Sequence, residues 1–83
     1  MSENLHIKGR ELRIIRELGV NTYELRAYQY GMPCGRLVGY LNHRSSVLTV
    51  YPGGRLAPGA FYRDDFPMRL RMDEIPWEKR KEG

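Results

Sequence analysis

The sequence predicts an α+β protein in which one N-terminal helix, over about residues 10–18, packs on a small antiparallel β-meander. Three observations lead to this fold class: apolar residues at helical spacing near the N-terminus, an alternating pattern from Tyr23 to Tyr51, and turn residues that interrupt it. The chain has 83 residues, a length typical of one domain. We expect that domain to span 1–77, followed by a charged tail over 78–83.

The predicted helix begins near Arg10 and ends near Leu18. Its apolar residues fall within one arc at about 100° per residue; they are Leu12, Ile14, Ile15 and Leu18. Gly19 follows as a helix stop. A strand stays open as an interpretation of this segment, since Leu12, Ile14 and Leu18 also share parity.

A helix-turn-helix over Glu11–Tyr28 is a second interpretation of the N-terminal region. The apolar and turn positions of that motif are matched by Ile14, Leu18, Gly19, Val20, Leu25 and Tyr28. The run from Leu18 to Thr22 resembles the turn of small phage-type repressors. This resemblance implies a DNA-binding regulator with a β-hairpin wing, which would present Asn21, Thr22, Tyr23 and Arg26 to the major groove.

Three runs rich in strand-forming residues predict the meander, at about 22–30, 36–42 and 47–51. Alternation places one set of aliphatic residues on a common face; they are Leu25, Ala27, Leu37, Leu41, Leu48 and Val50. Methionine and leucine alternating with arginine predict a further short strand over 67–72, with a proline at its start as at a sheet edge. A mainly-β small barrel is the third interpretation of the fold.

The opposite face of the meander is the predicted contact surface. Its residues are Arg26, Tyr28, Tyr30, Arg36, Tyr40, Arg44 and Tyr51. All six tyrosines and the whole net charge of +4 fall between Leu18 and Arg63. Because tyrosine stacks on bases and arginine pairs with phosphates, we expect a non-enzymatic module that binds nucleic acid or an acidic, nucleic-acid-handling protein. The alternative is that residues 61–77 fold across this face and make the tyrosines a second core layer.

A small inhibitor or antitoxin-like protein, acting by protein–protein contact, is the other function that we consider. Such a protein would bind by strand pairing or through the same tyrosines, and an edge strand could also form a homodimer. The run Gly31–Leu37, followed by Leu48–Tyr51 and Phe66–Met68, is similar in the order and spacing of its residues to the small N-terminal subdomain of HipA-type kinases. In that family the subdomain is fused to the kinase or acts against it as a separate protein, so the resemblance implies the same kind of partner.

No pattern in the sequence predicts catalysis, a metal site, a cofactor or a small-molecule substrate. Cys34 and His43 lack an orienting partner, and the adjacent pairs Asp64–Asp65 and Asp73–Glu74 are typical of solvated loops. No apolar run approaches the length of a membrane span. With a single cysteine and no secretory signal at Met1–Arg10, we expect a reducing, cytoplasmic setting.

Overall fold

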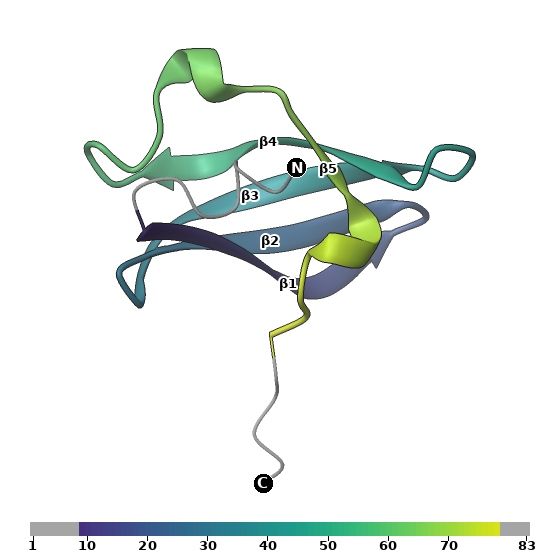
Figure 1. Ribbon diagram of the computed structural model, residues 1–83, viewed down its shortest axis with the longest axis horizontal. Coiled ribbons are helices and arrows are strands. Elements are labelled where there is room, and N and C mark those ends of the chain that lie inside the picture. Colours follow the sequence, from purple (N-terminus) through teal and green to yellow (C-terminus); the bar gives the residue numbers. More distant parts are fainter. Residues whose placement is uncertain (1–8, 79–83) are drawn as a thin grey trace, which may run out of the picture.

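A computed structural model describes residues 9–78 as one antiparallel sheet whose five strands follow chain order and curl into a half-barrel (Figure 1). The strands are β1 (Arg10–Gly19), β2 (Thr22–Gln29), β3 (Met32–Asn42), β4 (Val47–Leu56) and β5 (Met68–Arg71). Two single turns of 3₁₀-helix, η2 (Arg63–Asp65) and η3 (Met72–Glu74), flank β5. No α-helix occurs in this part of the chain.

The predicted helix over residues 10–18 is wrong, because this segment forms β1. Leu12 and Ile14 alternate with polar neighbours and are fully buried, as strand periodicity requires. A register shift between Ile14 and Arg16 then interrupts the alternation, as a β-bulge does. Leu18, which completed the helical arc, is 44% exposed and lies outside the core. The fold is therefore the mainly-β alternative.

The helix-turn-helix interpretation is wrong for the same reason. Its two helices would occupy Glu11–Tyr28, which instead form the β1–β2 hairpin. Gly19 pairs with Thr22, so only Val20 and Asn21 make the turn, and Asn21 has a positive φ of 58°. Asparagine tolerates that left-handed conformation better than most residues.

The three predicted meander strands are present, and two of them are longer than expected. Tyr30 and Gly31 form the β2–β3 turn with φ of 52° and 83°, the pattern of a two-residue type I′ hairpin, so β3 begins already at Met32. The β4 strand continues beyond its predicted end at Tyr51 through Pro52, Gly53 and Gly54, and ends at Leu56. Gly53 makes this continuation sterically feasible: a Cβ there would lie 2.8 Å from a methyl carbon of Val38.

The core lies on the concave side of the curled sheet. The largest fully buried side chains are those of Leu12, Ile14, Leu25, Leu37, Leu48 and Val50. The predicted aliphatic face is thus confirmed at most of its positions, with Leu41 half-buried at its margin. A helix was expected to cover this face. The curl of the sheet and side chains of the β4–β5 connection and β5, such as Phe61, Phe66 and Met68, cover it instead.

Residues 76–78, which we call the strap, return to β1 after η3. The backbone N–H of Ile14 donates to the Pro76 carbonyl at 2.9 Å, and the N–H of Glu78 donates to the Ile14 carbonyl at 2.8 Å. Trp77 thereby forms a parallel bridge with Ile14, and its ring meets Tyr23 edge-on at 6.0 Å. We placed Glu78 in a charged tail, yet it belongs to this strap; residues 79–83 lie outside the described residues.

Candidate contact surface

Two exposed tyrosines occupy the centre of the convex face. Tyr40 on β3 and Tyr51 on β4 are 51% and 42% exposed, and their ring centroids lie 5.8 Å apart at 64°. The strand register places Val38 opposite Tyr51 and Thr49 opposite Tyr40. These four residues are called the aromatic face below. Because the two rings meet edge to face, each keeps aromatic surface available to a planar group.

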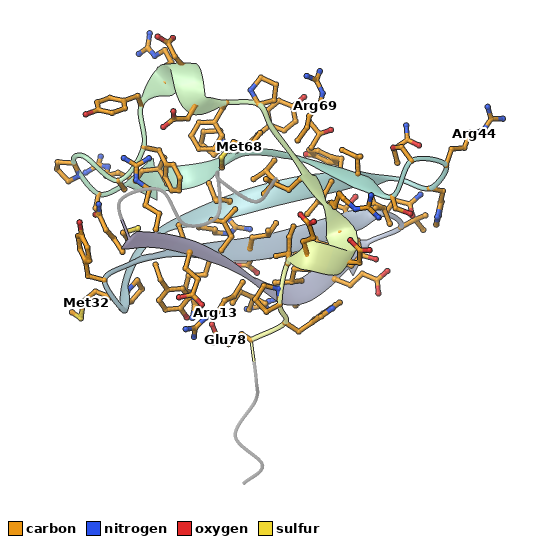
Figure 2. The ribbon with its side chains drawn as sticks, in the orientation of Figure 1. Arg13, Met32, Arg44, Met68, Arg69 and Glu78 are labelled. Atoms are coloured by element: carbon orange, nitrogen blue, oxygen red, sulfur yellow. The ribbon has the colours of Figure 1, made fainter. Side chains whose placement is uncertain are left out.

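Arginines that pair with no acid lie at the border of the aromatic face. Arg69 on β5 is directly opposite Thr49, which in turn is opposite Tyr40, so the three form one row across three strands. At the usual strand spacing the backbones of Tyr40 and Arg69 are about 10 Å apart. Arg44 lies in the β3–β4 turn, and both arginines point away from the ribbon in Figure 2. Neither forms an ion pair with another residue among 9–78.

Two arginines of the predicted surface are held by acids of the same face. Arg36 Nε lies 3.0 Å from a carboxylate oxygen of Glu24, whose second oxygen is 2.8 Å from Arg16 Nε. Arg26 Nη1 lies 3.5 Å from the Glu78 carboxylate. These pairs offset the repulsion between Arg26 and Arg36, which are direct cross-strand neighbours. Both side chains therefore have a structural role, and their role in a contact stays a prediction.

The two remaining predicted tyrosines lie away from the aromatic face. Tyr28 is only 8% exposed, since Arg13 covers its ring with the guanidinium carbon 4.4 Å from the centroid, and its hydroxyl donates to Glu78. Tyr30 is 76% exposed in the β2–β3 turn, at the opposite end of β3 from Arg44. The predicted residues thus fall into four groups. Tyr40 and Tyr51 lie at the centre of the face, Arg26 and Arg36 are ion-paired, Tyr30 and Arg44 lie in the turns at the two ends of β3, and Tyr28 is covered.

A hollow of about 420 Å³ lies beside the covered tyrosine. It is lined by Glu11, Arg13, Tyr28, Pro76, Trp77 and Glu78. Hydrogen bonding to Glu11 raises the pKa of Arg13 above its ordinary value, and hydrogen bonding to Tyr28 does the same for Arg26. Both guanidinium groups therefore stay charged at every accessible pH.

Arg10 is a buried cation on the concave side of the sheet. Its side chain is 7% exposed, with Nη1 3.5 Å from Asp65, Nη2 donating to the Gly59 carbonyl at 3.3 Å, and the Phe61 ring 4.8 Å from its guanidinium carbon. These contacts fasten the β4–β5 connection to β1. Nε of Arg10 has no hydrogen-bond partner among the residues that the structure describes.

Cys34 and His43, which could in principle act as nucleophile and base, are not brought together. They lie near opposite ends of β3, which at the rise of a strand separates them by about 30 Å. Burial raises the pKa of the Cys34 thiol above its ordinary value, and the charge of Arg10 opposes this effect only in part. Within residues 9–78 no three histidine, cysteine or acidic side chains gather as metal ligands.

Two parts of the surface escaped prediction from the sequence. Alternation along 67–72 does put Arg69 on the convex side, but nothing local shows that β5 pairs with β4 beside Tyr40 and Thr49. The strap lacks a strand-like pattern, so the sequence does not predict that it returns to β1 or that it covers Tyr28.

Comparison of the chain with protein-family models, curated proteins and solved structures gave no match. The comparisons therefore add nothing to the two resemblances noted in the sequence. No helix among residues 9–78 has the length and apolar character to traverse a lipid bilayer.

Proposed function

We propose that this protein is a small non-enzymatic binding module whose aromatic face engages single-stranded nucleic acid. The observation that carries the proposal is the exposed pair Tyr40 and Tyr51 on the open side of the sheet. Large aromatic side chains are seldom left paired in water on a sheet face without a contact function. Stacking of a base on tyrosine is sequence-tolerant and contributes about 1–3 kcal/mol per base.

The charge around the aromatic face supports an anionic partner. Arg44 and Arg69 have no acidic partner among residues 9–78, so a phosphate would meet them without first displacing a carboxylate. Arg36 lies two residues from Val38 on the same side of β3 and is half-exposed; because it shares the Glu24 carboxylate with Arg16, the three side chains keep one net positive charge at the opposite border. Arginine suits this task because its planar fork bonds two phosphate oxygens at once.

A single strand fits this surface better than a duplex. Bases stack on side chains only when their faces are free, and in a duplex those faces are covered by neighbouring base pairs. Among residues 9–78 the convex sheet also offers no projecting helix that could enter a major groove.

The proposal is tested by measuring fluorescence anisotropy of a labelled mixed-sequence oligonucleotide against the native protein and three variants. We expect the double variant Tyr40→Ala/Tyr51→Ala to bind about 30-fold or more weakly, from two lost stacking contacts. Tyr30→Ala is the matched control, because it removes an even more exposed tyrosine that lies far from the aromatic face. We expect its affinity to stay within about twofold of the native value.

A third variant, Arg63→Gln, controls for nonspecific loss of charge, since Arg63 lies in η2, outside the aromatic face. Circular dichroism of each variant confirms that the sheet is retained. Equal affinity of the native protein and the double tyrosine variant would contradict the proposal. A native protein that binds no oligonucleotide would contradict it as well, and would move the protein-directed inhibitor to first place.

A further inference from the structure

The hollow beside the strap is independent of the aromatic face, and it already holds a cation of this chain. The Arg13 guanidinium lies over the Tyr28 ring with its central carbon 4.4 Å from the ring centroid. Its Nε donates to Glu11 at 3.2 Å. Figure 2 shows Arg13 and Glu78 next to each other below β1. A guanidinium on an aromatic ring between carboxylates is the arrangement by which proteins recognise arginine.

The hollow contains open volume beside this internal contact. About 420 Å³ stays open next to Arg13, within the range of sites that accept small ligands. Its lining carries the carboxylates of Glu11 and Glu78 and the guanidinium of Arg13, and Arg26 Nη1 lies 3.5 Å from Glu78, so the site has one negative charge in excess once Arg13 moves out. Pro76 and Trp77 complete the wall, and Trp77 is 54% exposed. With Arg13 displaced, an apolar wall and one uncompensated carboxylate favour a cation in the place that Arg13 occupied.

We propose that this hollow binds the guanidinium group of an arginine side chain from a partner protein, and that Arg13 is its internal stand-in. The incoming group would take the position over the Tyr28 ring and pair with Glu11 or Glu78. Arg13, whose side chain is about one-third exposed, has a path into solvent and needs no movement of the backbone to leave. Arginine is favoured over lysine, because only a planar cation can stack on the ring and bond a carboxylate in its plane.

Trp77 makes the proposal measurable, because it is the only tryptophan of the chain and it lines the hollow. The probe is N-acetyl-argininamide, and its neutral counterpart N-acetyl-citrullinamide has nearly the same shape without the charge. We expect saturable change in Trp77 fluorescence with the arginine compound, at millimolar concentration as suits one small cation. The citrulline compound is expected to bind at least tenfold more weakly.

Three variants separate this site from a merely structural contact. Arg13→Met removes the internal competitor, and we expect binding of the arginine compound to tighten about three- to tenfold. Glu11→Gln removes the carboxylate that is left uncompensated once Arg13 moves out, and we expect binding to weaken by a similar factor. Glu17→Gln is the matched control, because Glu17 belongs to β1 but does not line the hollow. It should leave binding unchanged.

Two results would overturn the proposal, provided that circular dichroism shows the variants folded. One is the absence of a saturable response to the arginine compound in both the native protein and Arg13→Met. The other is an equal response to the arginine and citrulline compounds, which would show that charge plays no part. Neither result depends on nucleic-acid binding, because the hollow and the aromatic face share no residue.

Discussion

At the scale of single residues, Tyr28 and Tyr40 show what an alternating sequence pattern can and cannot predict. Alternation assigned Tyr28 and Tyr40 to one face, and both do lie on the convex side of the sheet. Their surroundings nevertheless differ completely, because Arg13 and Glu78 enclose Tyr28, whereas Tyr40 is about half exposed. Alternation reports the side of a strand, and it carries no information on a segment that arrives from 50 residues away.

The covered tyrosine predicts a stability contrast. We expect Tyr28→Ala to lower the free energy of unfolding by about 3 kcal/mol, because it removes a buried ring and the hydroxyl that donates to the Glu78 carboxylate. Tyr30→Ala, at an exposed turn position, should change it by no more than about 0.5 kcal/mol. Urea denaturation followed by circular dichroism measures both. Similar losses for the two variants would show that Tyr28 is not covered in solution.

The Cys34 thiol predicts a pH effect. Its pKa is raised above the ordinary 9.0 by burial, so the folded protein holds the thiol proton where the unfolded chain releases it. The resulting contribution to stability is complete below pH 9.0 and is lost as the pH rises through the folded pKa. We therefore expect alkylation of Cys34 by iodoacetamide at pH 8 to be slower in the native protein than in urea. A native rate equal to the unfolded rate would contradict this expectation.

At the scale of elements, the strands were predicted correctly wherever turn residues bounded a period-two pattern. The prediction was wrong where one segment fitted both a helical and a strand period. The segment 10–18 satisfies a helical arc and, up to Ile14, a strand alternation as well. A bulge after Ile14 breaks the alternation, and this is what made the helix attractive. Pairing with β2 decides the matter, since it buries Leu12 and Ile14 together. Local propensity is a weak guide when tertiary pairing is available.

The packing between β3 and β4 predicts a matched pair of glycine substitutions. A Cβ at Gly39 would lie 2.7 Å from Cγ and from a methyl carbon of Leu48, and 3.1 Å from Leu25, all within the fully buried core. We expect Gly39→Ala to destabilise the protein by about 1–3 kcal/mol through overpacking. Gly54→Ala should be neutral or stabilising by up to about 1 kcal/mol, because nothing lies within 4 Å of its Cβ position. Equal free energies of unfolding for the two variants would refute this packing.

At the scale of the whole molecule, contacts between distant parts of the chain decide which side chains of the convex face stay exposed. The strap joins β1 to the far end of the chain, and the β4–β5 connection fastens to Arg10. Both contacts join segments that are 49 or more positions apart in the sequence, so no local pattern predicts them. They leave the central part of the convex face open while covering Tyr28. The predicted homodimer stays a prediction, and β5, whose outer edge pairs with no strand among residues 9–78, offers the edge for it.

The most direct test of a phosphate-binding aromatic face is the salt dependence of oligonucleotide binding. If Arg36, Arg44 and Arg69 each neutralise one phosphate, the logarithm of the association constant should fall against the logarithm of salt concentration with a slope of about −2. The double variant Arg44→Gln/Arg69→Gln should reduce the size of that slope by about 1.4. A slope near zero for the native protein, or an unchanged slope for this variant, would contradict the proposed function.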